Sequence, residues 1–385
     1  MTFTAGVTGA GGFVGQYVVR RLTQRADARV VVCPREAWNS PTRLAAFLAP
    51  CDVIVHLAGL NRGSEDEVYR RNVELVERLV AAVERAPRSP GIVFASSTQR
   101  SRHNAYGRSK RRGEDLIEAW SARGGNAIAL EIPNVFGPGC RPHYNSVVAT
   151  FCDQLARGES PRIVSDAEIE FVWVGDLAAA IDAEVGELAA GRSRGYRLRR
   201  VPGRQPLLVS ELLAKLRGFL DSEDERGIVP DLTDPFDAQL YATLRSYLPL
   251  AAHVKRPSLH ADPRGELCEV IKLAGAGQVF FSTTRPGVTR GNHYHTRKSE
   301  WFCVLQGEAV IRLRRIGSDV VEEIRVRGDS PTFVSIPVLH AHHIENTGPD
   351  DLLTMFWTNE IFDPADPDTF AEAVLAAPQK QATAA

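Results

Sequence analysis

Three histidines and one glutamate have the side chains and part of the spacing of a metal site. His293 and His295 are separated by one residue, and Glu300 follows them within residues 287–307. Because side chains alternate between the faces of a strand, two histidines at this spacing point to the same side. Imidazole and carboxylate ligands together suit zinc, iron, nickel or copper better than calcium or magnesium. The sequence therefore predicts a transition-metal site, with zinc as the first choice.

The fourth ligand is expected from a later strand. The pattern G-x5-H-x-H-x4-E-x6-G over residues 287–307 resembles the first cupin motif, and P-x4-H-x3-N over residues 337–346 resembles the second. This resemblance implies an antiparallel barrel and makes His342 the predicted fourth ligand. His340 has the same strand parity and stays open as the alternative, whereas His343 points away. Leu339 stands where cupins usually have glycine, so the geometry of the turn before His342 is open.

A glycine turn opens the chain. Residues 3–15 read as a buried strand, a turn with the spacing G-x2-G-x2-G and the start of a helix. Glycines at such a turn let the backbone approach a pyrophosphate, and the helix N-terminus favours its negative charge. Further strands are predicted at residues 29–33 and 51–59, so a doubly wound parallel sheet is expected. The predicted cofactor-binding residues are Gly9, Gly12, Phe13, Val14, Gly15, Arg35, Leu57, Ala58, Gly59 and Lys110.

The residue that follows the second strand bears on cofactor choice. An acidic side chain there would accept hydrogen bonds from the ribose of NAD, whereas Arg35 can pair with the 2′-phosphate of NADP. NADPH is therefore the predicted cofactor. The alternative is that Arg35 is one of many surface arginines.

Tyr106 and Lys110 form a Y-x3-K pattern, which places both side chains on one face of a helix. The ammonium is expected to lower the pKa of the phenol, so that Tyr106 can exchange a proton while a hydride moves to or from the adjacent carbon. A hydroxyl from residues 96–98, at the end of the fourth strand, would hold the substrate oxygen. The combination resembles the extended short-chain dehydrogenase/reductase superfamily, and its offsets favour Ser97.

Composition allows two domains and excludes several classes of partner. The chain has 385 residues, of which 44% are hydrophobic, and a net charge of −1. No global field attracts nucleic acid or an anionic membrane, and we see neither a long apolar run nor a signal-peptide pattern. Six cysteines without a C-x-x-C pair fit a cytoplasmic protein. We expect a Rossmann-type domain at 1–250 and a cupin domain at 251–385, with a helix at 209–220 and then an irregular polar stretch ending near residue 247.

Both halves together resemble the CapF-type bifunctional enzymes of capsular polysaccharide synthesis, on residues 133–152, 344–348 and 356–364 as well as on the motifs. The resemblance implies that the cupin inverts C3 of a UDP-2-acetamido-2,6-dideoxy-4-hexulose and that the reductase domain reduces the C4 ketone with NADPH. It also implies a zinc ion on His293, His295, Glu300 and His342, and a homodimer. Carried over by position, the roles are a reductase triad of Ser97, Tyr106 and Lys110, proton transfer by Lys298, and UDP-sugar contacts by Asn134, Tyr144 and Asn145.

Some alternatives stay open at this stage. Lys298 could be a solvated loop lysine, because a lysine must be desolvated to act as a base near neutral pH. A reductase with a structural, non-catalytic cupin is the second hypothesis for the whole chain. A nucleotide-sensing regulator is the third, and the presence of Tyr106, Lys110 and a strand-end serine argues against it.

Overall fold

The computed structural model describes residues 2–224, 228–255, 259–262, 265–268, 272–274, 277–360 and 363–375. The chain divides into two compact units. The first comprises Met1–Thr150 and Ser165–Val209, and the second comprises Phe151–Val164 and Ser210–Ala385. The chain enters the second unit for the last time at residue 210, earlier than the boundary expected after residue 250.

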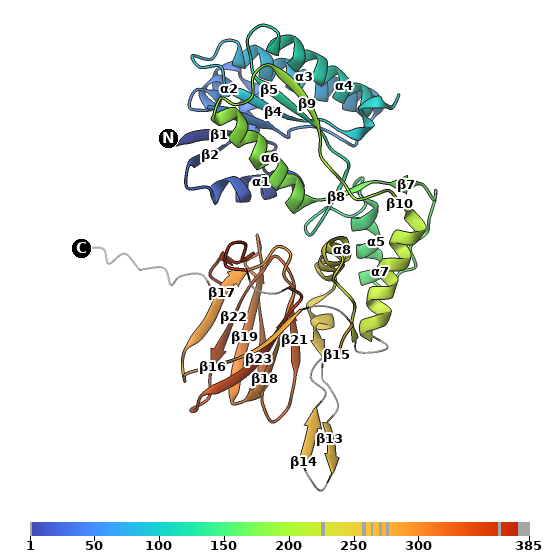
Figure 1. The fold of residues 1–385 in the computed structure, drawn as a ribbon, viewed down its shortest axis with the longest axis vertical. Helices are drawn as coiled ribbons and strands as arrows, with labels where there is room; N and C mark the ends of the chain where they lie inside the picture. Colours follow the sequence, from blue (N-terminus) through green and yellow to red (C-terminus); the bar gives the residue numbers. More distant parts are fainter. Residues whose placement is uncertain are drawn as a thin grey trace, which may run out of the picture. The chain divides into compact units, whose positions relative to one another are not determined.

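A parallel six-stranded sheet forms the centre of the first unit (Figure 1). The strand order is β2-β1-β3-β4-β5-β9. From β1 the chain first adds β2 on one side and then β3, β4, β5 and β9 on the other, and this change of side is the switch point of a doubly wound fold. Every neighbouring pair is parallel. The strands are β1 (Phe3–Thr8), β2 (Ala28–Val32), β3 (Val53–His56), β4 (Gly91–Ala95), β5 (Ala127–Glu131) and β9 (Tyr196–Arg200).

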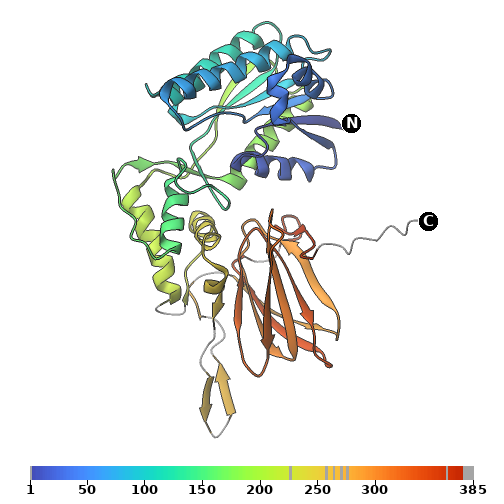
Figure 2. The same cartoon turned by 180° about the vertical axis from the view of Figure 1, so that it is seen from behind.

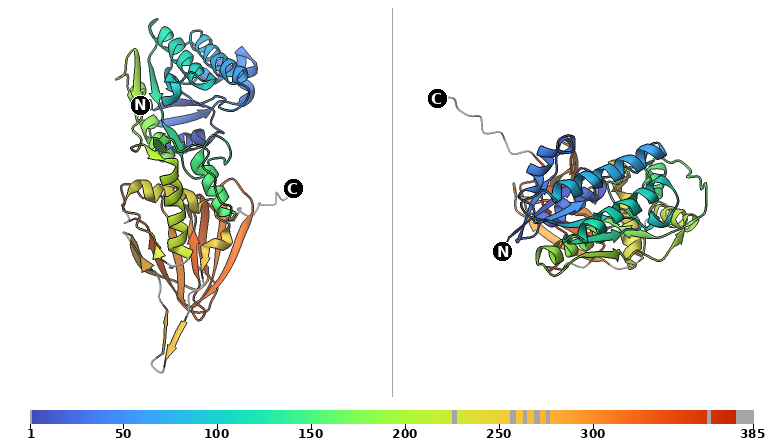
Figure 3. Two further views of the ribbon diagram at one scale, coloured as in Figure 1. Left: turned by 90° about the vertical axis from the view of Figure 1, so that its right-hand side faces the viewer. Right: turned by 90° about the horizontal axis from the view of Figure 1, so that it is seen from above.

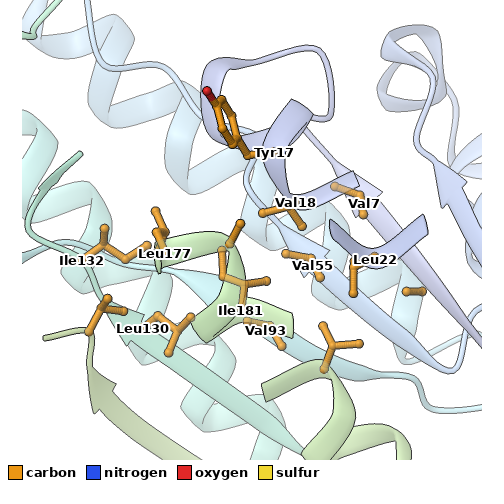
Figure 4. Close-up of a cluster of buried hydrophobic side chains, with 14 of the residues drawn as sticks. Val7, Tyr17, Val18, Leu22, Val55, Val93, Leu130, Ile132, Leu177 and Ile181 are labelled. Atoms are coloured by element: carbon orange, nitrogen blue, oxygen red, sulfur yellow. The ribbon is translucent and has the colours of Figure 1, made fainter. Parts of the chain in front are cut away.

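Helices cover both faces of this sheet. On one face, α1 (Phe13–Thr23) and α6 (Val174–Ala189) bury the cluster shown in Figure 4, to which alternate residues of the strands contribute. On the other face lie α2 (Pro41–Leu48), α3 (Glu65–Val83) and α4 (Ala105–Ser121), and Figure 3 shows α3 and α4 side by side. Because both faces are buried, the central strands are apolar on both sides, as parallel sheets require.

Short elements complete the first unit. The 3-10 turns η1 (Arg35–Asn39) and η2 (Thr98–Ser101) follow β2 and β4. Two further pairs of strands are β6 (Asn134–Phe136) with β8 (Phe171–Trp173) and β7 (Glu168–Ile169) with β10 (Leu207–Leu208). The division between the units falls within α5 (Val147–Ala156).

Two antiparallel five-stranded sheets form the barrel of the second unit (Figure 2). Their orders are β12-β21-β18-β23-β16 and β20-β19-β22-β17-β24, and apolar side chains from both sheets pack in the lumen. This is the jelly-roll architecture of a cupin, as the two histidine motifs predicted. The strands are β12 (Val254–Lys255), β16 (Gln278–Thr284), β17 (Thr289–Tyr294), β18 (Glu300–Gln306), β19 (Glu308–Arg315), β20 (Val321–Arg327), β21 (Phe333–Ile336), β22 (His340–Asn346), β23 (Leu352–Thr358) and β24 (Phe370–Ala371).

Several elements of the second unit precede or join the barrel strands. They are α7 (Val209–Asp224), β11 (Ile228–Val229), α8 (Pro235–Arg245), η3 (Leu250–His253), β13 (Leu259–Asp262), β14 (Gly265–Cys268) and β15 (Lys272–Leu273). Strand β11 pairs in parallel with β15, and β13 pairs with β14 as a hairpin.

The expectation of an irregular polar stretch up to residue 247 is wrong. Helix α7 extends to Asp224, and helix α8 occupies residues 235–245 and buries Phe236, Leu240 and Tyr241. Two charged residues of this region are paired inside the unit. Arg245 forms a buried ion pair with Glu223, and its guanidinium also reaches Ser335 Oγ in β21 at 2.6 Å. Among the described residues, none of the helices combines the length and apolar character needed to traverse a bilayer.

Candidate active site and candidate metal centre

The glycine turn after β1 brings the backbone of two segments unusually close. Gly9 has a φ of +69°, and its carbonyl accepts a hydrogen bond of 3.0 Å from the amide of Gly12. A Cβ atom on Gly15 would lie 2.2 Å from Gly9 O. Phe13 and Val14 begin α1, so the amides of its first turn are directed at the end of β1. This cradle fits the pyrophosphate of a dinucleotide, because a helix N-terminus binds anions where the backbone can be approached closely.

The loop after β3 lies against the same turn. The amides of Leu57 and Ala58 both donate to Thr8 Oγ1, each at 3.2 Å. A Cβ on Gly9 would come within 2.7 Å of the Ala58 amide nitrogen. The structure therefore brings the predicted residues of the two loops together. Arg35 lies at the start of η1, directly beyond β2, and is exposed.

Tyr106 and Lys110 lie one turn apart in α4, as the spacing predicted. The Lys110 ammonium donates to Ala95 O at 2.7 Å and lies 5.5 Å from the centroid of the Tyr106 ring. A Cβ on Gly59 would be 4.0 Å from Lys110 Nζ, so the lysine lies beside the loop after β3. Ser97 follows β4, and its Oγ caps η2 by accepting from the Gln99 amide at 3.2 Å.

The electrostatics of this pair differ from the expectation. Burial raises the pKa of Tyr106 to about 12, whereas the sequence interpretation expected Lys110 to lower it. Burial also lowers the pKa of Lys110 to about 8, although Glu114 opposes this shift. The expected lowering fails because the phenol is desolvated and the ammonium is directed at Ala95 O. Tyr106 is therefore a neutral phenol over the whole physiological range, as a proton donor must be.

Two of the three predicted sugar contacts, Tyr144 and Asn145, lie against residues 61 and 62 of the loop after β3. Tyr144 lies between two arginines, with the Arg141 and Arg62 guanidinium carbons 5.3 Å and 5.9 Å from its ring centroid. Asn145 has a φ of +58°, and its side chain donates to Asn61 O at 2.5 Å. Asn134 begins β6 and donates to Glu170 O at 3.4 Å.

Two buried polar residues escaped the sequence interpretation. The Asn72 amide holds the loop after β3, donating to Leu60 O at 2.8 Å and to Ser109 Oγ at 3.1 Å. Glu114 accepts from Ser96 Oγ and pairs with Arg100. Both lie on buried faces of long helices, where a polar side chain needs a partner. That contrast with their apolar neighbours is the signal that could have found them.

The four predicted metal ligands gather at one end of the barrel. One ligand atom from each of His293, His295, Glu300 and His342 lies within 4.8 Å of the others. Glu300 Oε2 is 3.1 Å from both His295 Nε2 and His342 Nε2. Neither nitrogen has a hydrogen-bond partner of acceptable geometry, and both are buried. Buried lone pairs that converge without protons between them fit a metal ion, and the imidazole and carboxylate set fits zinc.

His342 joins this group, whereas His340 and His343 contact other groups. His340 Nδ1 contacts Val338 O at 3.0 Å, and His343 Nδ1 contacts Asn292 Oδ1 at 3.0 Å. Leu339 adopts a φ of +58°, the left-handed conformation that glycine favours, although it carries a side chain. The turn before His342 therefore keeps the glycine-type geometry that the sequence had left open.

A bulge sets the position of His293. In the pairing of β17 with β22, Gly291 lies opposite His343 and His293 lies opposite His342, so Asn292 is an extra residue. Its φ of +60° marks the bulge. Bulges redirect side chains near functional sites, and here the bulge turns His293 toward the other ligands. The ring centroids of His293 and His342 are 4.7 Å apart.

Burial and charge act in opposite directions within the cluster. Burial lowers the pKa of His293 to about 4, assisted by His342 and His295. Burial would raise the pKa of Glu300, but the neighbouring imidazoles of His295, and then His342, hold it well below its usual range. The carboxylate and a neutral imidazole are the forms that ligate a metal.

Lys298 is buried and is not a solvated loop lysine. Its exposed fraction is 5%, and its ammonium donates to Pro367 O at 2.7 Å. Its backbone amide donates to Asp368 Oδ2 at 2.8 Å. The lysine lies in the loop between His295 and Glu300, so it stands next to the metal ligands in sequence.

Comparisons with known proteins cover both units. Residues 5–196 match the NAD dependent epimerase/dehydratase family, and residues 260–370 match the polysaccharide biosynthesis C-terminal domain. A Pseudomonas aeruginosa protein, UDP-2-acetamido-2,6-beta-L-arabino-hexul-4-ose reductase, is 36% identical over 96% of this chain and 98% of its own length. The spore coat polysaccharide biosynthesis protein SpsL of Bacillus subtilis is 27% identical over 30% of this chain and 83% of its own length.

Solved structures give the same result. The capsular polysaccharide assembling protein CapF from Staphylococcus aureus has a TM-score of 0.60 and 34% identity, covering 96% of this chain and all of its own, 100%. The Bordetella bronchiseptica enzyme WbmF is similar in fold, with a TM-score of 0.52 at 16% identity over 64% of this chain and 91% of its own. The chain thus belongs to the CapF-type family of polysaccharide biosynthesis, in which an epimerase/dehydratase-type domain is joined to a cupin.

Proposed function

We propose that this chain is a bifunctional nucleotide-sugar enzyme that inverts C3 of a UDP-2-acetamido-2,6-dideoxy-4-hexulose and reduces its C4 ketone. The observation that carries the proposal is the position of Tyr106 and Lys110 beside the loop after β3 and the glycine turn. The name of the P. aeruginosa relative supports a UDP-linked 4-ketosugar as the substrate. The product would enter polysaccharide or glycoconjugate synthesis of the UDP-N-acetyl-L-fucosamine type.

The first unit would carry out the reduction. Ser97 would hold the C4 carbonyl oxygen, and Tyr106 would donate its phenolic proton to that oxygen as the carbonyl double bond opens. Bound NADPH would supply the hydride that forms the new C–H bond at C4. Lys110 would keep a positive charge beside Tyr106 and the cofactor loop. Arg35 would pair with the 2′-phosphate, which favours NADPH over NADH.

The second unit would carry out the epimerisation. A ketone at C4 acidifies the proton at C3, so a base can remove that proton and an acid can return it on the opposite face through an enediolate. Lys298 is the candidate for this transfer. Zinc would be held by the four clustered ligands and would supply positive charge and cross-linking between strands. A homodimer and a cytoplasmic site of action remain parts of the proposal.

A reductase with a non-catalytic cupin is the second candidate, and one contact favours it. The Lys298 ammonium is buried and donates to a backbone carbonyl, which restrains a group that proton transfer requires to move. Four protein ligands would also close a tetrahedral site, and closed zinc sites are more often structural.

Isotope exchange separates these two candidates. The substrate is incubated with the enzyme in heavy water without NADPH, and deuterium at C3 is measured by mass spectrometry. Incorporation supports epimerisation by the cupin. A reductase that consumes NADPH but never exchanges C3 would support the second candidate.

Tyr106→Phe tests the division of labour. It is expected to reduce NADPH oxidation by about 10²- to 10⁴-fold, because a positioned acid contributes that much. Exchange at C3 should continue at the unaltered rate. Joint loss of both activities in a folded variant would indicate a single shared site and contradict the proposal.

A further inference from the structure

The segment of residues 363–375, here called the clasp, adds a short strand beside a metal ligand. Strand β24 pairs with the end of β17, so that His293 lies opposite Ala371 and Tyr294 opposite Phe370. The rings of Tyr294 and Phe370 are stacked with centroids 5.2 Å apart. The clasp therefore completes the sheet at the end of the barrel where the ligands gather.

One residue of the clasp fixes the ring of His295. The backbone carbonyl of Asp368 lies 2.6 Å from His295 Nδ1, and the residue is 4% exposed. A carbonyl can only accept, so Nδ1 carries the proton and Nε2 keeps its lone pair. Nε2 is the nitrogen that lies 3.1 Å from Glu300 Oε2 in the cluster. Such a contact from the second nitrogen orients a metal-binding histidine and sets its tautomer.

The side chain of the same residue holds the loop between two ligands. The Asp368 carboxylate accepts from the amides of Thr296, Arg297 and Lys298, at 3.1 Å, 2.9 Å and 2.8 Å for Oδ2. It also accepts from Thr296 Oγ1 at 2.6 Å. These residues connect His295 to Glu300. Three consecutive amides directed at one carboxylate form a cradle that fixes the loop backbone.

The far end of the clasp is bound to the bulge before His293. The amides of Glu372 and Val374 donate to Asn292 O and Oδ1, at 2.9 Å and 3.3 Å. Arg314 of β19 donates to Ala373 O at 2.7 Å. Since Asn292 is the extra residue of the bulge, the clasp touches the backbone next to His293 as well as next to His295.

From these contacts we propose that Asp368 is a positioning residue of the metal centre, and that the clasp and the metal stabilise each other. The inference rests on the proposed metal site. Metal binding and docking of the clasp are two coupled equilibria, and such coupling is reciprocal. If the docked clasp raises metal affinity by some factor, the bound metal raises the equilibrium constant for docking by the same factor. No ligand lies in the clasp, and its effect on affinity acts through His295, the loop and the bulge.

The direct test compares two aspartate-to-asparagine substitutions within the clasp. Asp368→Asn keeps the shape and suits the φ of +44°, because asparagine tolerates that region. It places an NH₂ group or a neutral oxygen before three amide donors. Asp366→Asn is the matched control, because Asp366 is exposed and its carboxylate pairs with Arg297. Zinc affinity of the full chain is measured by competition with a chromophoric chelator.

Asp368→Asn is expected to weaken zinc binding by about 10- to 100-fold, the usual effect of altering an outer-shell partner. Asp366→Asn should stay within about twofold, because exposed ion pairs contribute little. With Co²⁺ in place of zinc, the visible absorption of Asp368→Asn should also change, since it reports ligand geometry. A purely structural role for Asp368 would lower stability without altering that spectrum.

Hydrogen exchange on the unaltered chain provides a test that needs no variant. Zinc should slow exchange of the Glu372 and Val374 amides, which donate to Asn292. Equal exchange with and without zinc would overturn the coupling, as would equal zinc affinity in the two variants. If the unaltered chain binds no zinc at all, the metal site itself fails, which is a different result.

Discussion

Lys110 is a buried cation whose charge depends on pH within the working range of an enzyme. Its pKa is lowered to about 8 because burial disfavours the ammonium, and Glu114 in the next turn of α4 restores part of the shift. Tyr106 titrates far above it, since burial raises its pKa to about 12. Of the two groups, the lysine is therefore the one that changes its charge near neutral pH.

This order of titration predicts the pH profile of the reductase. Lys110 is an ammonium below pH 8 and neutral above it, so kcat/KM for NADPH-dependent reduction should fall as the pH rises through about 8. The arginine of Lys110→Arg stays charged over this range, so this variant should not show the fall above pH 8, although its rate of reduction is lower. The measurement is the reduction rate from pH 6 to 10. A flat profile up to pH 10 would contradict the assignment.

Arg35 carries the prediction of cofactor choice. Arg35→Asp should move preference from NADPH towards NADH, because an attractive contact with the 2′-phosphate becomes a repulsive one. Arg85→Asp is the control, because it makes the same change in charge. Arg85 precedes β4, whereas Arg35 follows β2, so the two residues lie at opposite ends of the parallel strands. The measurement is the ratio of kcat/KM with NADPH to kcat/KM with NADH, compared between the two variants. Equal use of both cofactors by the unaltered protein would refute the interpretation.

Whole elements were predictable where their signal was periodic or local. The helix period places Tyr106 and Lys110 on one face of α4, and strand alternation places His342 rather than His343 with the other ligands. Helix α8 was missed because it begins in a stretch rich in charges and prolines, although Asp237 pairs with Lys215 of α7. Asp368 was missed because its contact to His295 spans 73 positions, and no local pattern marks it.

The bulge in β17 allows a test of element geometry. A Cβ on Gly291 would lie 2.8 Å from His342 O and 2.9 Å from His343 Cα. Gly291→Ala should therefore push β17 away from β22, cost about 1–3 kcal/mol of stability and weaken metal binding. Melting temperature and zinc titration measure the two effects.

Gly287→Ala is the control for the bulge. Gly287 also has a positive φ, +72°, but a Cβ there meets nothing within 4 Å. It should share the backbone strain and leave zinc affinity unchanged. If both variants lose zinc equally, strain at a positive φ would suffice and the contact with β22 would be irrelevant.

At the scale of the molecule, the boundary of the cupin unit is testable. Arg245 in α8 pairs with Glu223 of α7, and its guanidinium carbon lies 5.4 Å from the centroid of the Trp301 ring in β18. A chain starting at residue 251, the boundary expected from the sequence, would lack this network and expose one face of the barrel.

A chain of residues 210–385 should therefore be more stable than one of residues 251–385. The shorter fragment lacks both Arg245 and Glu223, and it leaves Ser335 Oγ and the Trp301 ring without the buried guanidinium that they contact. A buried polar group that loses its partner costs about 1–3 kcal/mol, which is a large part of the stability of a domain. Soluble yield, thermal melting and zinc content of the two fragments are the measurements. Equal stability of the two fragments would favour the predicted boundary at residue 250.

The alternation of the chain between the two units has a consequence for folding during translation. Phe151–Val164 is grouped with Ser210–Ala385, while Ser165–Val209 returns to the first unit. Phe151 and Cys152 are buried in the finished protein. Translation must advance by roughly 80 residues, about 4–16 seconds, before α7 and α8 are complete. During that interval the apolar residues of α5 lack the helices of their own unit, so we expect them to be accessible to a chaperone.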